Sequence, residues 1–156
     1  MRPLCCTVLA LLLLALPQDA RADRGDFGVG LIVGRPTGLT GEYWLSDRTA
    51  IDMALGLDLF DGRHFYAHAD FLFVLPNLLG GGSVELSPYL GPGVYIADRG
   101  SKNDDRLGLG VRVPFGLSLD FTRAPLQLFI EIAVSVSLVP GVDAGVGGAG
   151  GFRYYF

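Results

Sequence analysis

Cysteine is almost missing from this sequence of 156 residues, since the only two are Cys5 and Cys6. Both lie in an N-terminal segment that we expect to be removed. Without them, the remaining chain can form no disulfide, covalent haem attachment or zinc–thiolate site. Lysine occurs once, at Lys102, and the formal net charge is −4. This charge balance excludes a basic nucleic-acid-binding surface, so nucleic acid is not an expected partner.

Charged residues are also scarce, at 18%, whereas an ordinary soluble domain has about 25%. Half of the residues are hydrophobic, and glycine accounts for 23 of the 156. This composition is too apolar for a disordered chain, and the length suits a single domain. Beyond the N-terminal segment, no apolar run is long enough to predict a membrane-spanning helix. A structure other than a membrane-spanning helix must therefore remove this large apolar surface from water.

The N-terminus has the pattern of a secretory signal peptide. Arg2 supplies the positive charge, residues 4–16 form a leucine-rich run without charge, and Ala20-Arg21-Ala22 matches a small-x-small cleavage site. The run is too short for a spanning helix. We expect cleavage after residue 22, which leaves residues 23–156 as one domain. A lipoprotein signal ending at either cysteine is the alternative, but it requires a longer apolar stretch before the cysteine.

Apolar and polar residues alternate with a period of two in the rest of the chain, which is typical of half-buried β-strands. Ile51, Met53 and Leu55, for example, share one face of their segment, whereas polar and small residues lie between them. Eight strands are predicted, at residues 27–34, 39–45, 51–59, 65–73, 84–96, 107–119, 126–138 and 145–156. The segment 84–96 is the least regular, because its prolines at 88 and 92 remove donors from a strand ladder.

Short connectors separate these strands. They lie at residues 36–38, 46–49, 61–63, 76–82, 98–105, 122–125 and 140–143. Most are hairpin-sized, so consecutive strands are expected to be antiparallel neighbours. The expected fold is all-β: an eight-stranded antiparallel up-and-down β-barrel.

Packing indicates which face of this barrel points outward. The interior of an eight-stranded barrel is just wide enough for side chains to fill. One face carries Leu, Ile, Val and Phe along the strands and would overfill that space, whereas the other carries Gly, Ala, Ser and acids. We therefore expect the apolar face in lipid, so that the barrel is transmembrane. A soluble, lipocalin-like ligand-binding barrel with the opposite orientation is the alternative.

The last strand places Phe152, Tyr154 and the terminal Phe156 on the apolar face. In this respect the sequence resembles the small eight-stranded outer-membrane β-barrels of the OmpA/OmpX type, whose last strand ends in Phe with aromatics at alternate positions. The segments 34–39 and 43–45 (Gly-Arg-Pro-Thr-Gly-Leu and Tyr-Trp-Leu) also resemble a group of small bacterial barrel proteins without a defined biochemical role.

The resemblance implies a location in the outer membrane of a Gram-negative bacterium, with both termini in the periplasm. The connectors at 36–38, 61–63, 98–105 and 140–143 would then face outside. It further implies that the chain contacts outer-membrane lipid, that Phe152, Tyr154 and Phe156 form the signal read by the barrel-assembly machinery, and that the barrel is a monomer.

Ionisable residues on the inward face predict a polar network in the lumen. Its expected members are Glu42, Asp52, His68, Asp70, Arg112, Glu131 and Arg153, with Asp58, Glu85 and Asp120 on the same face. With the last hairpin centred near Gly141, Glu131 would lie opposite Gly151, one diagonal step from Arg153. A cluster of Glu131, Arg153 and Arg112, with Glu42 across the lumen, is therefore expected. It would act as a plug that fixes the barrel; a gate for ions is the alternative.

Chemical sites are weakly indicated. A catalytic set of His68, Asp70 and a serine such as Ser87 would face the lumen rather than lipid and lacks a nucleophile elbow. A metal site from His64, His68 and Asp70 is disfavoured because His64 and His68 are four residues apart on a strand. Weak calcium binding by the acidic loop at 98–105 is less favoured than a solvated loop. No catalytic residue, cofactor or metal is predicted.

The predicted function is that of a small integral outer-membrane barrel with a structural or surface-interaction role, a filled lumen and no enzymatic activity. Three alternatives remain open: a narrow passive pore for ions or small solutes, an outer-membrane lipid-modifying enzyme, and the soluble lipocalin-like barrel.

Overall fold

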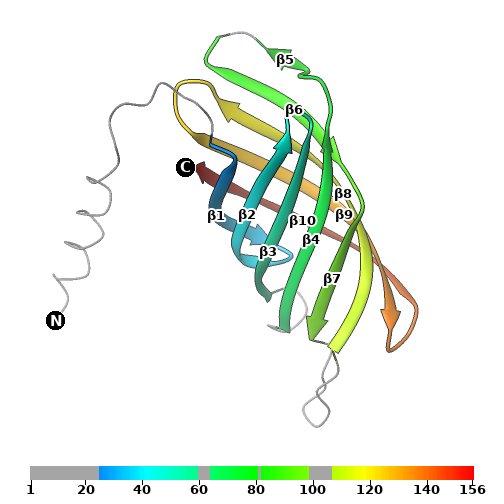
Figure 1. The fold of residues 1–156 in the computed structure, drawn as a ribbon. Coiled ribbons are helices and arrows are strands. Elements are labelled where there is room, and N and C mark those ends of the chain that lie inside the picture. The colour runs from blue at the N-terminus through cyan, green and yellow to red at the C-terminus, as the bar shows by residue number, and fades with distance from the viewer. Residues whose placement is uncertain (1–24, 60–63, 81, 99–106) are drawn as a thin grey trace, which may run out of the picture.

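The computed structural model describes residues 25–59, 64–80, 82–98 and 107–156 (Figure 1). The expected leader 1–22, the connector 61–63 and most of the connector 98–105 lie outside the described residues. Within them the regular structure is all β, and no helix is long and apolar enough to cross a membrane. The strands are β1 (Phe27–Gly34), β2 (Thr37–Ser46), β3 (Thr49–Asp58), β4 (His64–Val74), β5 (Leu79–Gly80), β6 (Val84–Leu90), β7 (Gly93–Asp98), β8 (Leu107–Phe121), β9 (Leu126–Val139) and β10 (Asp143–Tyr155).

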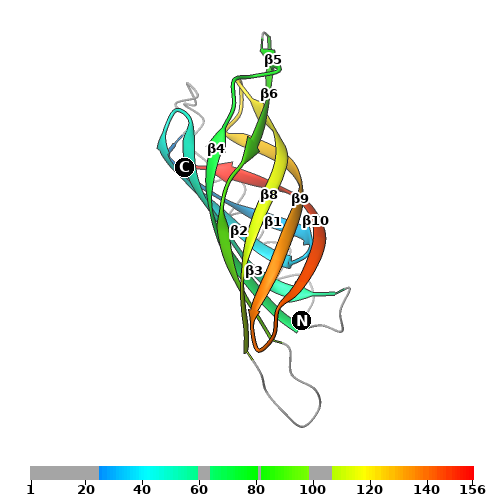
Figure 2. The same cartoon turned by 90° about the vertical axis from the view of Figure 1, so that its right-hand side faces the viewer.

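These strands close into a ring with eight wall positions. Consecutive strands pair antiparallel from β1 to β4, and β8, β9 and β10 continue the wall. The position between β4 and β8 is shared by β6 and β7, which each pair with both neighbours. The ring closes where β10 pairs with β1, from Gly28 opposite Tyr155 to Gly34 opposite Ala149. The predicted eight-stranded up-and-down arrangement is confirmed, and Figure 2 shows its strands running obliquely around the wall.

The least regular predicted strand is indeed interrupted. It divides into β6 and β7 at Gly91 and Pro92, where the proline has no N–H to donate. The Pro92 carbonyl still accepts from the Phe71 amide of β4 at 2.8 Å. The inward phase continues across the break, because Tyr89 and Tyr95 are both buried inside. The wall is therefore continuous although the strand is not.

The sequence predicts only a connector at 76–82, and this is wrong in one respect, because the segment contains the short strand β5. Within it, β5 pairs with β6, with Leu79 opposite Leu86 and Gly80 opposite Glu85. The Leu78 amide also donates to the Leu86 carbonyl at 2.8 Å. These bonds fold the segment back on β6 as a short hairpin, which extends beyond one end of the ring (Figures 1 and 2).

The two faces of the wall differ as the alternation predicts. Buried and exposed residues alternate strictly along β1, with Phe27, Val29, Leu31 and Val33 exposed. The apolar positions lie side by side across strands: Leu31 faces Leu39 on one side and Phe152 on the other, and Phe152 in turn faces Leu128. The outside of the ring is therefore a continuous apolar band.

Large aromatic side chains fit inside the ring because glycines lie opposite them. Three tyrosines are direct cross-strand partners of glycine, in the pairs Tyr155–Gly28, Tyr95–Gly110 and Tyr89–Gly116. A methyl group on any of these glycines would overlap the tyrosine ring. The glycine-rich inner face thus provides the volume that the tyrosines occupy.

Candidate functional site

The lumen contains all seven residues of the predicted polar network. Each is buried, with at most 5% of its surface exposed. They come from six strands: Glu42 from β2, Asp52 from β3, His68 and Asp70 from β4, Arg112 from β8, Glu131 from β9 and Arg153 from β10. Alternation points each side chain inward, and closure of the ring brings distant strands together.

Arg153 is the centre of one half of the network. Its Nη2 lies 2.6 Å from Asp52 Oδ1, and its Nη1 lies 3.2 Å from Glu42 Oε1. The guanidinium also donates to Thr40 Oγ1 at 2.9 Å and to Gln127 Oε1 at 3.0 Å, and it lies 4.0 Å above the centre of the Phe129 ring. Charge-assisted hydrogen bonds of this kind offset the desolvation of a buried cation.

Arg112 is the centre of the other half. Its Nη2 donates to Glu131 Oε1 at 2.5 Å, and its Nη1 donates to His68 Nδ1 at 2.6 Å. Its Nε lies 3.3 Å from Asp70 Oδ2. Because arginine has donors but no acceptor, His68 Nδ1 must be the acceptor in this contact.

The expected grouping of Glu131 with both arginines differs from the structure. Glu131 pairs with Arg112, whereas the ion pairs of Arg153 within the described residues go to Glu42 and Asp52. The expected register is also wrong, because Glu131 lies opposite Ala149.

The physical reason for this register is the position of the last turn. Ser137 pairs with Asp143, so the hairpin is centred on Pro140 rather than on Gly141. Moving the centre of an antiparallel hairpin by one residue shifts every cross-strand partner by two. Gln127, not Phe129, is consequently the residue opposite Arg153.

Several residues that complete the network were not singled out from the sequence. The hydroxyl of Tyr155 donates to Glu42, and that of Tyr89 donates to Glu131 at 3.3 Å. Trp44 Nε1 lies 3.4 Å from the Tyr155 hydroxyl. The two tyrosines stand at inward positions of predicted strands, so the alternation could have identified them.

The other ionisable residues expected on the inner face lie towards the ends of the ring. Asp58 is buried and pairs with Arg35, with Arg35 Nε 2.5 Å from Asp58 Oδ2. Asp120 is buried and accepts from Gln127 at 3.0 Å. Glu85 is half-buried and lines a cavity of about 760 Å³ at the end of the ring near Trp44.

The residues of the alternative metal and catalytic sites are not grouped as the sequence suggests. His64 lies 4.0 Å from Asp98, and the group that offers three neighbouring donor atoms is Asp52, His68 and Asp70. Four residues along a strand span about 13 Å, which separates His64 from His68. The Ser87 hydroxyl donates to Asn77 Oδ1 at 2.7 Å.

The C-terminal residues of the predicted assembly signal lie on the outside of the ring. Phe152 and Phe156 are exposed, and the rings of Tyr154 and Phe156 meet edge to face with centroids 5.1 Å apart. The Phe156 amide donates to the Phe27 carbonyl at 3.0 Å, so the last residue is joined to the first strand. Whether the assembly machinery reads these residues stays a prediction.

Comparisons with known proteins bear on the fold. No family model matches the sequence, and no curated protein matches it. Among solved structures, the N-terminal β-barrel domain of Pseudomonas aeruginosa OprF aligns with a TM-score of 0.54 and 11% identity, over 85% of this chain and 98% of that one. Ail, the attachment invasion locus protein of Yersinia pestis, aligns with a TM-score of 0.40 and 17% identity, over 83% of this chain and 96% of that one.

The likeness to the OprF domain agrees with the ring of eight wall positions. Both the strand order and the outward apolar face match the architecture that the sequence predicts. The chain therefore has the fold of the small eight-stranded outer-membrane β-barrels of the OmpA/OmpX type.

Proposed function

We propose that this protein is a small integral outer-membrane β-barrel of a Gram-negative bacterium, with a structural or surface-interaction role and no enzymatic activity. In this proposal residues 1–22 are a cleaved signal peptide and residues 23–156 form the barrel. Lipid surrounds the wall, the barrel-assembly machinery recognises the last strand, and the protein is monomeric.

The observation that carries the proposal is the inversion of the two faces. Ile130 and Ile132 on β9 are 63% and 61% exposed, whereas Arg112 and Arg153 are 2% and 1% exposed inside the ring. A water-soluble protein rarely exposes a contiguous apolar patch of more than a few hundred Å². Lipid is the solvent for which a continuous apolar band is suited, and a closed ring satisfies the backbone there.

The interior supports a structural role rather than transport. The two guanidinium groups contact side chains from β2, β3, β4 and β9, so they cross-link the wall through the lumen. Phe129, Tyr89 and Tyr155 fill further space at the same level of the ring. The interior of an eight-stranded barrel is just wide enough for side chains to fill, and this filling favours a structural role over a pore.

Membrane fractionation with a heat-modifiable gel shift tests the location and the fold. We expect the protein in the outer-membrane fraction, migrating differently before and after boiling. A protein that stays monomeric without detergent and shows no gel shift would contradict the proposal and favour the soluble lipocalin-like barrel.

Conductance in planar bilayers tests the filled lumen. We expect no stable single-channel step from the wild-type protein. A reproducible step that changes size in Arg112→Ala or Glu131→Ala variants would replace the structural role with that of a narrow pore.

A further inference from the structure

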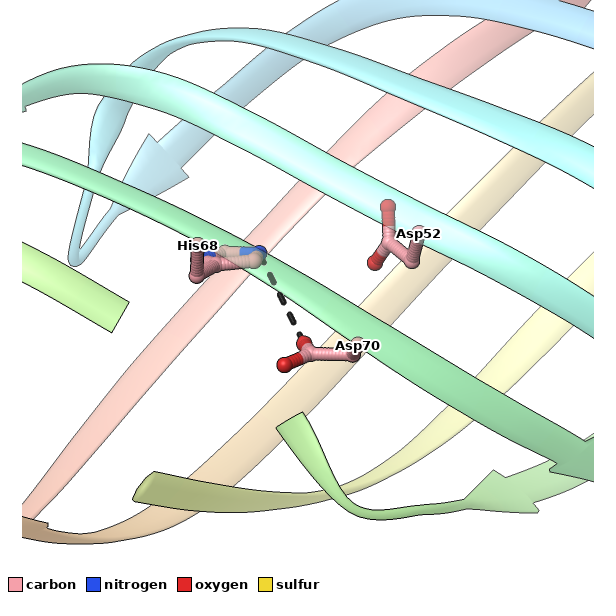
Figure 3. Close-up of side chains that lie close together, drawn as sticks. All are labelled: Asp52, His68 and Asp70. Atoms are coloured by element: carbon pink, nitrogen blue, oxygen red, sulfur yellow. Dashed lines mark ion pairs between the residues drawn. The ribbon is translucent and has the colours of Figure 1, made fainter. Parts of the chain in front are cut away.

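Three side chains from neighbouring strands converge in the lumen: Asp52 from β3, and His68 and Asp70 from β4 (Figure 3). Asp52 and Asp70 are direct cross-strand partners, and His68 shares the inward face of β4 with Asp70. One donor atom from each of the three residues lies within 4.8 Å of the other two. Spacing of this kind allows three ligands to reach one metal ion after small side-chain adjustments.

Several atoms of these three residues that could bind a metal ion form no hydrogen bond. Asp52 Oδ2, His68 Nε2 and both carboxylate oxygens of Asp70 are buried without a hydrogen-bond partner in the described part of the chain, and so is Arg112 Nε. Asp70 Oδ2 does have two longer contacts, 3.3 Å to Arg112 Nε and 3.7 Å to His68 Nε2; Figure 3 marks the second of these with a dashed line. The side chains of His68 and Asp70 are fully buried, as is Asp52. Buried polar atoms almost always have a partner, because leaving one without costs about 1–3 kcal/mol. Asp52 Oδ2 and Asp70 Oδ1 have neither a hydrogen bond nor an ion pair in the described part of the chain, and these two oxygens indicate a ligand between the strands.

Charge supplies a second, independent argument. The network holds four carboxylates, from Glu42, Asp52, Asp70 and Glu131, and two guanidinium groups. With all four carboxylates ionised and His68 neutral, the buried network carries two more negative than positive charges. One divalent cation would neutralise this excess.

We propose that Asp52, His68 and Asp70 bind a divalent transition-metal ion, for which Zn²⁺ is the best match. Carboxylate oxygen and imidazole nitrogen are both zinc ligands, and three protein ligands with a further open position are a common zinc arrangement. The imidazole distinguishes this set from the all-oxygen sites of calcium and magnesium. The site is formed by the closed ring, so the metal-binding proposal does not depend on the proposed membrane location.

Binding changes the tautomer of His68. Because Arg112 donates to Nδ1 at 2.6 Å, the hydrogen of the neutral imidazole lies on Nε2 when no metal is bound. A metal bound through Nε2 moves this hydrogen to Nδ1 and displaces the Nη1 donor of Arg112. Arg112 keeps its contact with Glu131 through Nη2 at 2.5 Å. The proton stays on the imidazole, so the exchange is balanced.

Gly93 positions the Asp70 carboxylate. It is the direct partner of Asp70 on β7, and a methyl group at this position would overlap Asp70 Oδ1. A Gly93→Ala variant therefore moves one ligand without removing any. Weaker metal binding in this variant would indicate that Asp70 is a metal ligand and not only part of a structural pair of carboxylates.

The test is metal content after refolding of the untagged chain 23–156 into detergent with Zn²⁺, followed by dialysis and elemental analysis. Each preparation is first checked for the heat-modifiable gel shift. We expect one Zn²⁺ per chain in the wild type and in the control His64→Gln, which alters the only other histidine. His68→Gln, Asp70→Asn and Gly93→Ala should bind Zn²⁺ about tenfold more weakly or worse.

Two results would overturn the proposal. One is a folded wild-type protein that retains no Zn²⁺, since the excess negative charge would then be balanced by protons. The other is equal Zn²⁺ retention in Gly93→Ala and wild type together with its loss in His64→Gln, which would place the ion at His64 and Asp98. If His68→Gln does not fold, Co²⁺ substitution in the wild type and in Gly93→Ala decides, because the visible spectrum of the ion reports its ligands.

Discussion

Arg153 and Asp52 are 101 residues apart in the chain, yet Arg153 Nη2 lies 2.6 Å from Asp52 Oδ1 inside the ring. The pair is fully enclosed, with no bulk water to replace either partner. Its geometry links β10 to β3, which are not neighbours in the wall. Stability of the ring should therefore depend strongly on this arginine.

Arg153→Met should lower the free energy of unfolding by about 3–5 kcal/mol, because it leaves Glu42 and Asp52 buried without their cation. The matched control is Arg123→Met, at an exposed position between β8 and β9, which should change stability by less than about 0.5 kcal/mol. Urea unfolding in detergent or lipid vesicles measures both. Equal shifts in the two variants would show that Arg153 has no special place in the fold.

Gly116→Ala should destabilise the ring by about 1–3 kcal/mol through overpacking against Tyr89. Gly41→Ala is the control, since an added methyl there meets its nearest neighbour at an ordinary 3.6 Å. The temperature at which the gel shift is lost reports the difference. A Gly116 variant as stable as the Gly41 variant would mean that the tyrosine moves aside freely.

Ile132→Arg tests the solvent of the outer face. In lipid, arginine near the middle of a strand should cost about 2–4 kcal/mol, whereas on a water-exposed surface it would be nearly neutral. Val142→Arg, in the turn between β9 and β10 and 82% exposed, serves as the control. Folding yield and unfolding free energy in vesicles give the comparison, and a neutral Ile132 variant would support the soluble barrel.

Phe156→Ala should reduce the amount of barrel assembled in cells while leaving refolding in detergent nearly unchanged. The side chain is 72% exposed, and the contact of this residue with Phe27 uses backbone atoms. Phe73→Ala, another exposed outer-face phenylalanine, is the control. Loss of assembly in both variants alike would remove any special role for the terminal residue.

The sequence predicts the strands of the ring well, because the alternation of apolar and polar residues within each strand shows which side is buried. Val84–Leu90 keeps its phase although Pro88 lies within it, since inward Ser87 and Tyr89 still alternate with outward neighbours. Whether a side chain points into the lumen or outward therefore depends only on its position within its own strand. This is why all seven residues of the predicted network do lie in the lumen.

Pairing between side chains is not local, and the sequence predicts it poorly. The partner of Glu131 depends on the centre of a turn at Pro140, and an error of one residue there changes the opposing residue from Gly151 to Ala149. Contacts across the lumen depend further on the tilt of the strands, which no single strand encodes. The pairing of Arg153 with Asp52 and Glu42 could therefore not be derived from the alternation.

The position of Arg153 near the end of the chain has a consequence for the order of synthesis. Its acidic partners at 42 and 52 are made first, and the cation that neutralises them follows 111 and 101 residues later. An incomplete chain cannot enclose those carboxylates without leaving them unpaired. Neutralisation of these carboxylates therefore requires β10, so the burial of Glu42 and Asp52 is coupled to closure of the ring.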